Sequence, residues 1–552
     1  MKDDNERCIA ELINGAEHTS ASGASIPCSD LKPKLLIENT DPQRTIVALR
    51  DNLATEGTLF DRGVPVRLVT DHQTGIATAR PITADALVML AHTVTRPIIV
   101  KSKDGRADEH NARFPRPLAV AYLDWHGEWQ LPPLNGIAST PLLRADGAIT
   151  GVNGYDRLTG FWLENVVDIS SLVLARPTRS DALAALQLLR ATFATFCFAD
   201  AAMVPKPSDA STVDLTSPPG HDETALLVAL LTAVCRPSLD LAPGFLVRAP
   251  QLSGAGSGKG LLVRSICRIA FGREPHAVTG GSDLAELEKR IVAELIGGGP
   301  ALFLDNLNNV TFRSNLLASA ITERPARVRI LGKSQMLPLN ATVFIALTGN
   351  ALSVSEDLAR RFIAIELDPR MEDPETRYFA TDMFQNAGER RAELLAAVLT
   401  IWRWGRHQSA LPQGRPLGSF DQWSRWVRDP LLALGCRDPV ERLVDAKQHD
   451  GHRQEIVEIF RLWEQLHGAK PVTAHALHPR IQLAIDPQKR GRQFVASQLA
   501  KLAGARVAGF TLSRQPSAGR WSPDTYCLHS DDPPAPHREH RHHRSESDDG
   551  DA

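Results

Sequence analysis

The sequence predicts an α/β protein built on a parallel sheet with a phosphate-binding loop (P-loop). An α+β region is expected before this sheet, and a helical, winged-helix-like region after it. Three observations support the fold class. A glycine-rich segment separates a short apolar run from a stretch with helical spacing of apolar residues. Further apolar runs follow at intervals, with polar residues at their ends. Helical spacing then dominates after Pro369.

The first element is the segment Ser253–Gly260, with the sequence Ser-Gly-Ala-Gly-Ser-Gly-Lys-Gly. It follows the apolar run Phe245–Ala249 and opens a helical pattern, so we expect strand, loop and helix in that order. Backbone N–H groups of such a loop surround a phosphate, and Lys259 can reach the terminal phosphates of a nucleotide. The residues expected to bind the nucleotide are Gly254, Gly256, Ser257, Gly258, Lys259 and Gly260.

Two positions of this loop depart from the strict pattern G-x-x-x-x-G-K-[ST]. Ser253 replaces the first glycine, and Gly260 replaces the hydroxyl residue that normally ligates Mg²⁺. Metal binding is therefore expected to differ from that of an ordinary P-loop. The alternative interpretation is a flexible Gly/Ser loop with an exposed lysine.

The second element is the apolar run Gly299–Leu304, which reads as a buried strand ending in Asp305. Asp305 lies 46 residues after Lys259 and is the expected Mg²⁺ ligand, since P-loop NTPases hold the metal with an acid at this place. Asn306 follows, where a hydrolytic motor more often has Asp or Glu. An amide can align water but is a poor base. A strand-end turn rich in Asp and Asn explains the same residues.

The third and fourth elements supply an amide and two arginines. The run Thr342–Thr348 reads as a strand, and Asn350 after it can bond the γ-phosphate or the lytic water. Arg360 and Arg361 precede the apolar run Phe362–Leu367. Guanidinium groups suit a phosphate on a neighbouring subunit because their planar fork binds oxygens bidentately. The alternative for both arginines is a surface ion pair with a nearby acid.

A β-hairpin with a basic tip is predicted between the second and third strands, over Ala326–Leu339. Four basic residues and no acid lie between Arg324 and Lys333. Arg327, Arg329 and Lys333 are the candidates for contact with a phosphate backbone. A solvated hairpin without a ligand is the alternative.

Composition indicates an ordinary globular protein. The chain has 552 residues, 43% apolar and 23% charged, with a formal net charge of −2, so any nucleic-acid contact must come from local patches. Its seven cysteines stand singly, which favours neither a zinc ribbon nor a disulfide framework and suits the cytoplasm. No apolar run reaches the roughly 18 residues that span a bilayer, and no membrane partner is expected.

Periodicity and turn signals divide the chain into seven segments. Residues 1–32 and 529–552 are expected to be disordered, and residues 483–528 carry seven basic residues in a winged-helix-like pattern. The expected order is a leader (1–32), an α+β domain (33–178), a helical lead-in (179–240), the ATPase core (241–370), a helical domain (371–482), the basic unit (483–528) and a tail (529–552). Within the helical lead-in, a Pro/Ser/Thr-rich loop is expected over residues 205–219.

The motifs over residues 240–370 resemble those of superfamily three helicases of the AAA+ class. The surrounding chain is similar to primase-helicase proteins of phages, plasmids and integrative elements. The resemblance implies Mg-ATP on Lys259 and Asp305, γ-phosphate sensing by Asn350, and a homo-hexamer completed by Arg361 or Arg360. It also implies that Lys333 on the hairpin carries single-stranded or forked DNA through the ring. Gly260 and Asn306 depart from the family's usual residues.

Two classes of function follow from these observations. The first is an ATP-dependent DNA helicase or translocase in the replication of a mobile genetic element, working with a separate primase or replication initiator. The second is an ATP-binding switch for DNA loading or assembly with little or no hydrolysis, in which Gly260 and Asn306 mark lost catalysis.

Overall fold

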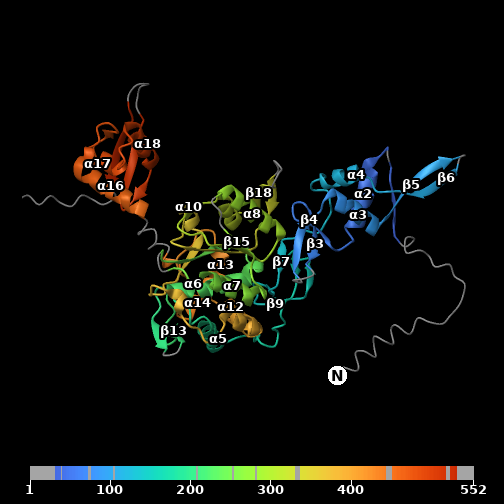
Figure 1. Ribbon diagram of the computed structural model, residues 1–552, viewed down its shortest axis with the longest axis horizontal. Helices are drawn as coiled ribbons and strands as arrows, with labels where there is room; N and C mark the ends of the chain where they lie inside the picture. Colours follow the sequence, from blue (N-terminus) through green and yellow to red (C-terminus); the bar gives the residue numbers. More distant parts are fainter. Residues whose placement is uncertain are drawn as a thin grey trace, which may run out of the picture. The chain divides into compact units, whose positions relative to one another are not determined.

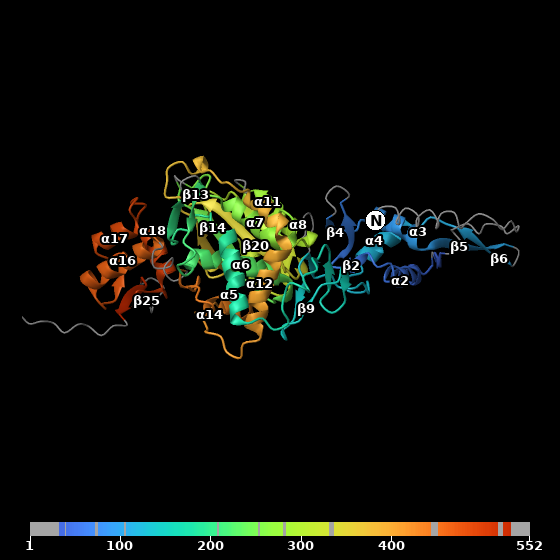
Figure 2. The same cartoon turned by 90° about the horizontal axis from the view of Figure 1, so that it is seen from below.

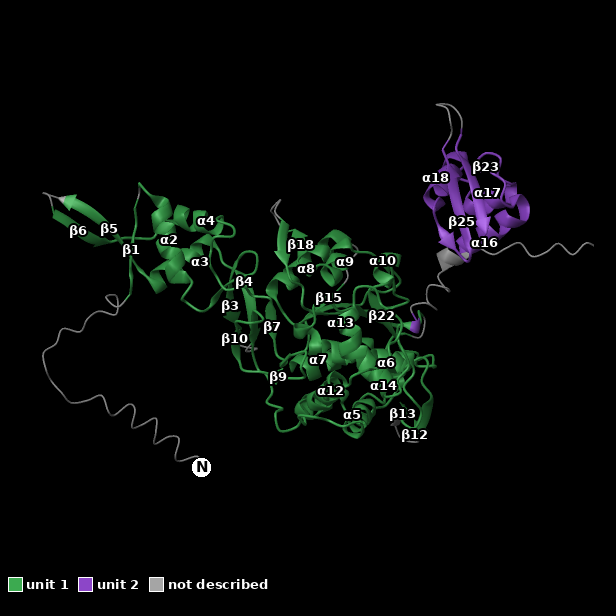
Figure 3. Cartoon of the chain, turned by 180° about the vertical axis from the view of Figure 1, so that it is seen from behind, with its two compact units in different colours: residues 1–440 green, residues 441–552 purple. Residues whose placement is uncertain are grey.

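Two compact units, residues 1–440 and 441–552, make up the computed structural model of the chain (Figure 3). The structure describes residues 32–38, 40–71, 76–103, 106–206, 209–251, 254–279, 283–329, 336–442, 451–516 and 523–530. The expected leader, apart from Lys32, and the tail beyond Ser530 lie outside these residues. In the part that is described, no helix is both long and apolar enough to cross a membrane.

A five-stranded parallel sheet forms the centre of the first unit, with the order β15-β16-β20-β14-β22. These strands read as nearly continuous apolar runs because both faces of a parallel sheet are covered by helices. Four of them lie within two residues of the predicted runs, whereas the short β15 has no such run. Their bounds are β14 Gly244–Ala249, β15 Ala277–Thr279, β16 Ala301–Asp305, β20 Phe344–Asn350 and β22 Phe362–Glu366. The predicted α/β core with a parallel sheet is confirmed.

Helices cover the sheet and connect its strands (Figure 1, Figure 2). α7 (Lys259–Phe271) packs on β14, β16 and β20, and α8 (Leu284–Gly297) packs on β15 and β16. α6 (His221–Cys235) lies against β22 and α7 and is buried along almost its whole length. The smaller elements of this part are β17 Thr311–Phe312, α9 Asn315–Thr322, β18 Ala326–Arg329, β19 Met336–Leu339, β21 Ser353–Val354 and α10 Glu356–Ala359.

The N-terminal part of the first unit combines small sheets with three helices. Its sheets are β1-β5-β6, β2-β3-β4, β10-β11-β7 and β8-β9. A core around Leu49, Leu87 and Phe114 joins the helices. The element bounds are β1 Lys34–Leu36, α2 Pro42–Leu53, β2 Leu59–Asp61, β3 Pro65–Thr70, β4 Ala77–Pro81, α3 Ala84–Val94, β5 Arg96–Lys103, β6 Arg106–Asn111, α4 Arg116–Leu123, β7 Gly136–Ala138, β8 Leu142–Leu143, β9 Ile149–Thr150, β10 Gly154–Asp156 and β11 Phe161–Leu163.

Helices flank the central sheet in sequence, as the periodicity predicts. α5 (Arg179–Thr192) and α12 (Arg391–Arg406) pack against each other, and Trp402 and Trp423 are fully buried in the core. The other elements are η2 Arg236–Ser238, η3 Pro374–Thr376, α11 Met383–Glu389, α13 Asp421–Trp423, η4 Ser424–Arg428 and α14 Asp429–Ala433.

One predicted loop is partly a hairpin. The Pro/Ser/Thr-rich stretch over 205–219 contains β13 (Asp209–Val213), which pairs antiparallel with β12 (Met203–Lys206). Val213 is buried, and its N–H donates to Ala194 O at 2.7 Å. The prediction of a loop was wrong for this part of the stretch. The burial of Val213 and the backbone hydrogen bonds of the hairpin stabilise a strand, although the composition of the stretch is typical of turns.

The second unit is a small α+β fold with one four-stranded antiparallel sheet, β23-β26-β25-β24. Its core joins Phe460 and Trp463 of α16 to Leu512 and Leu528 of the sheet. Helices expected in the preceding domain (371–482) thus belong to this unit, because their apolar faces are buried against the sheet. The bounds are α16 Gly451–His467, β23 Val472–Thr473, α17 Pro479–Ile485, α18 Arg492–Leu502, β24 Arg506–Val507, β25 Phe510–Gln515 and β26 Thr525–Ser530.

Candidate nucleotide-binding site

The glycine loop ends at the first residue of α7, and its Ser253 lies outside the described residues. Gly256 and Gly258 have φ angles of +68° and +92°, a left-handed region that favours glycine. A Cβ atom at Gly254 would overlap Pro250 O and lie 2.5 Å from Asn350 Oδ1. The three glycines therefore allow the chain to turn sharply in front of the helix. Free N–H groups at a helix N-terminus bind anions, as the sequence predicts for this loop.

Lys259 lies inside the loop. Its ammonium donates to Gly254 O at 2.6 Å and to Ser257 Oγ at 3.0 Å. Burial lowers the pKa of Lys259, while the charges of Asp305 and Cys197 act in the opposite direction. The ammonium is thus held within the loop by one carbonyl and one hydroxyl.

Asp305 ends β16 beside the first turn of α7. Thr348 of β20 donates a hydrogen bond from its hydroxyl to Asp305 Oδ1. A Cβ atom at Gly260 would lie 3.8 Å from both carboxylate oxygens of Asp305. The loop and the strand-end acid therefore face each other, which is the relation that their order in the sequence predicts.

An arginine also faces this carboxylate. Arg264 Nη2 lies 3.6 Å from Asp305 Oδ2, and Arg264 Nη1 lies 3.9 Å from the position of a Cβ at Gly260. Mg²⁺ requires near-octahedral oxygen coordination at about 2.0–2.1 Å. Here the protein offers one carboxylate, no hydroxyl at residue 260, and a guanidinium group beside it. These residues do not fit a Mg²⁺ ion held in the usual way. Within the described ranges, no group of three or more His, Cys, Asp or Glu side chains is placed to hold a metal.

Asn306 belongs to a turn. Its φ angle is +67°, a conformation that Asn adopts more readily than Glu does, and its Oδ1 accepts from Asn308 Nδ2 at 3.1 Å. Its N–H donates to Thr348 Oγ1 at 3.2 Å. The segment after Asp305 is therefore a strand-end turn, as the alternative interpretation of the sequence holds. The positive φ angle at residue 306 gives a physical reason for Asn at this position.

Asn350 ends β20 and closes the site. Its N–H donates to Asn308 Oδ1 at 2.7 Å, and its C=O accepts from Asn309 N at 2.9 Å. Its side-chain Oδ1 is buried against Gly254 and has no hydrogen-bond partner within the described part of the chain. Oδ1 can only accept, for example from a water molecule, so a bond to a phosphate oxygen would have to come from the side-chain Nδ2.

The two arginines before β22 have different surroundings. Arg361 donates to Ala318 O at 2.6 Å and to the Thr322 hydroxyl, and its side chain is 23% exposed. Arg360 is 61% exposed and pairs with Asp357 at 2.8 Å. Both arginines pair with this acid, which matches the alternative interpretation from the sequence. Arg360 is the more exposed of the two, whereas Arg361 is bound to α9.

The predicted hairpin is formed by β18 and β19, which pair in register from Ala326↔Leu339 to Arg329↔Met336. Arg327 and Arg329 alternate with buried residues and lie on the exposed face. Lys333 lies outside the described residues. Arg324, counted among the basic residues of the hairpin, instead donates to the carbonyls of Ala320, Glu323, Asp240 and Ala341, and burial lowers its pKa to about 10. It serves the fold and is not a candidate DNA ligand.

A hollow of about 310 Å³ lies at the carboxyl ends of β14 and β22, and none of the loop residues Gly254–Gly260 lines it. Ligands of open α/β sheets bind at this edge, where the strand order reverses. The strand order reverses between β14 and β20, because the chain leaves β14 toward β15 on one side and leaves β20 toward β22 on the other. The hollow is lined by Ala199, Arg248–Pro250, Ala351–Ser353 and Glu366–Asp368.

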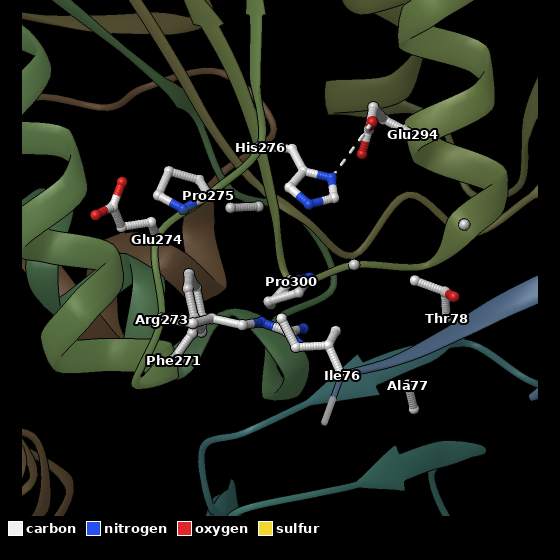
Figure 4. A pocket seen from close by; sticks show the side chains of 13 residues that line it. Ile76, Ala77, Thr78, Phe271, Arg273, Glu274, Pro275, His276, Glu294 and Pro300 are labelled. Atoms are coloured by element: carbon white, nitrogen blue, oxygen red, sulfur yellow. Dashed lines mark ion pairs between the residues drawn. The ribbon is translucent and has the colours of Figure 1, made fainter. Parts of the chain in front are cut away.

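A second cavity lies near the other end of α7 and measures about 70 Å³ (Figure 4). It is lined by Ile76 and Thr78 of the N-terminal part and by Arg273, which donates to Glu164 Oε1 at 3.2 Å. His276 and Glu294 approach to 3.9 Å at its rim. Small-molecule sites usually measure about 300–1,000 Å³, so this second cavity is too small for a nucleotide.

Three residues that contribute to the site are not evident from the sequence. Thr348 belongs to an apolar run and Arg264 to a helical pattern, so neither stands out. Arg377 lies beyond the predicted core and donates to Gly256 O at 3.0 Å. For Arg264, its position four residues after Gly260 on the same helix face can be recognised once Gly260 is placed in the site.

The chain matches no family model, and no curated protein is similar to it. Solved structures do show similarity, among them a protein described as "SCCmec type IV Cch - active helicase". The two chains are 11% identical, with a TM-score of 0.29, over 86% of this chain and 97% of that chain.

Proposed function

We propose that this chain is an ATP-dependent DNA helicase or translocase of the superfamily three, AAA+ type. It would act in the replication of a mobile genetic element such as a phage, plasmid or integrative element. The observation that carries the proposal is the convergence of Lys259, Asp305 and Asn350 at one edge of the parallel sheet. Each comes from a different strand–helix segment, and hydrogen bonds through Thr348 and Asn308 link the strand ends.

The residues divide the binding of ATP between them. Backbone N–H groups of Gly256–Gly260 surround the phosphates, and Lys259 supplies positive charge after releasing the carbonyl of Gly254. Asn350 bonds the terminal phosphate or the water that attacks it. Asn306 cannot act as a strong base because it is an amide, so hydrolysis in this site is expected to be slow.

Assembly and DNA binding use other surfaces of the chain. Arg360 is the group we assign to the phosphates of a neighbouring subunit in a homo-hexamer, because an arginine supplied by a neighbour stabilises charge in phosphoryl transfer. Arg327, Arg329 and Lys333 of the hairpin bind single-stranded or forked DNA. The basic α18 and the β25–β26 hairpin of the second unit are a further, winged-helix-like DNA contact. A separate primase or replication initiator completes the system in the cytoplasm.

The second candidate function is an ATP-binding switch for DNA loading or assembly. The observation that favours it is the chemistry at the loop: residue 260 has no hydroxyl, and the base position is an asparagine held in a turn. Such a protein binds ATP and changes its assembly, with little or no hydrolysis.

DNA-stimulated hydrolysis by the purified protein separates the two functions. A helicase releases phosphate, and single-stranded DNA increases the rate several-fold. A switch binds ATP with equal affinity, but its rate does not respond to DNA. Lys259→Ala removes the loop cation and should abolish ATP binding in either case. Lys289→Ala, which removes an exposed cation of α8, is the matched control. Nucleotide affinity unchanged by Lys259→Ala would refute the loop assignment itself.

A further inference from the structure

The carboxylate of Asp305 already has a cation from its own chain. Arg264 Nη2 lies 3.6 Å from Asp305 Oδ2, and its Nε lies 3.8 Å from Glu274 Oε2. Asp305 Oδ1 accepts from the Thr348 hydroxyl. Both oxygens of the expected metal ligand therefore face protein groups.

Helix geometry explains why this arginine reaches the loop. Residues four apart lie on one face of a helix, and side chains tilt toward its N-terminus. Arg264 follows Gly260 by four residues in α7, so its side chain runs back over Gly260 toward Asp305. Because residue 260 has no side chain, nothing separates the guanidinium from the carboxylate. A Cβ there would lie 3.9 Å from Arg264 Nη1 and 3.8 Å from Asp305.

In an ordinary P-loop ATPase, the divalent cation lies in the space between residue 260 and the strand-end acid, which Arg264 occupies here. A dication and a guanidinium repel each other at such distances, and residue 260 offers the metal no hydroxyl. A guanidinium can perform the electrostatic part of the metal's task itself. Its planar fork binds phosphate oxygens bidentately and stays charged at all physiological pH values.

We propose that Arg264 takes the place of the divalent cation in nucleotide binding. Its guanidinium neutralises Asp305 and contacts the terminal phosphates, so that the affinity for a nucleoside triphosphate barely depends on Mg²⁺. The inference rests on the proposed nucleotide site and adds a residue to it. Arg264 is partly exposed, at 39% of its side chain, so its guanidinium can reach a phosphate while it stays beside the carboxylate of Asp305.

The test is the affinity for a fluorescent ATP analogue, measured by titration in excess Mg²⁺ and again in excess EDTA. Wild-type affinity should differ by less than about threefold between the two conditions. Arg264→Ala should bind about 10- to 100-fold more weakly in EDTA, since a hydrogen bond to a charged group contributes about 1.5–3 kcal/mol. Lys289→Ala should behave as wild type in both conditions. Thermal melting of each variant shows that the fold is kept.

A second variant should restore the dependence on a divalent cation. Gly260→Ser combined with Arg264→Ala restores a hydroxyl next to Asp305 and removes the guanidinium, so its nucleotide affinity should become dependent on Mg²⁺. Wild-type affinity that falls more than about tenfold in EDTA would overturn the role of Arg264 and leave the nucleotide site intact. Absence of binding in both conditions would overturn the proposed function together with this inference.

Discussion

Two glycines of the loop, Gly254 and Gly260, should respond in opposite ways to the same added methyl group. A Cβ at Gly254 would overlap the carbonyl oxygen of Pro250 and lie 2.5 Å from Asn350 Oδ1, so the loop has to move. Overpacking of this kind costs about 1–3 kcal/mol. If the bound loop needs its present shape, Gly254→Ala should weaken nucleotide binding by about 5- to 150-fold, at about 1.4 kcal/mol for each factor of ten.

Gly260→Ala meets no atom closer than 3.8 Å and lies in the first turn of α7. Replacing a helical glycine by alanine stabilises by about 0.5–1 kcal/mol, so this variant should melt slightly higher than wild type and keep its nucleotide affinity. Titration with a fluorescent ATP analogue and a thermal melt measure both quantities on the same samples. Equal affinities of the two variants would refute the assignment of Gly254 and Asn350 as a close-packed part of the site.

Three further sets of substitutions test separate parts of the molecule. Lys333→Ala, in the segment between β18 and β19, should spare nucleotide binding, weaken DNA binding and reduce the salt slope by about one for each phosphate that the variant no longer binds. A salt titration like that of wild type would instead favour the basic second unit as the DNA-binding surface. Arg360→Ala should lower ATP hydrolysis without changing the melting temperature. Arg361→Ala should lower the melting temperature, because the protein loses the bonds of Arg361 to Ala318 and Thr322. Equal melting temperatures of the two variants would contradict their different roles. Arg391→Ala should destabilise the protein by about 1–3 kcal/mol, since the carbonyls of Ser139, Ile269 and Ala270 lose their donor. Arg391→Lys should recover little of this stability. Denaturant unfolding of both variants measures the difference.

The loop and the strand ends are predictable from the sequence because both depend on local patterns. A buried parallel strand is an apolar run, and the residue after it lies at the edge where ligands bind. Asp305 and Asn350 can be found in this way. Neighbours within the sheet are not predictable from such runs, and β15 is too short to produce a pattern. The order of the strands depends on crossover connections, which no single run contains.

Roles of individual arginines are the least predictable part. Arg360 and Arg361 are adjacent in sequence, yet the turn before β22 directs one to solvent and the other to α9. Arg324 looks like part of a basic hairpin but binds four carbonyls. Arg264 looks like a solvated position of an amphipathic helix. In each case the partner is distant in sequence or is a backbone atom, so composition gives no signal of it.

Buried arginines also explain why the N-terminal part belongs to the same compact unit as the central sheet. Arg62 donates to Leu295 O and Ile296 O, the last carbonyls of α8, and Arg391 donates to the end of α7 and to Ser139 O. A guanidinium suits this task because it can satisfy several orphan carbonyls of a helix end at once. Burial lowers the pKa of both arginines to about 10, which still leaves them charged at neutral pH. The glycine loop leads into the first turn of α7. The last turn of α7 is bound by Arg391, which also contacts Ser139 of the N-terminal part. Further bonds, such as Thr342 Oγ1 to Asn135 O and Ile137 N to Gly298 O, also hold the N-terminal part on the central sheet.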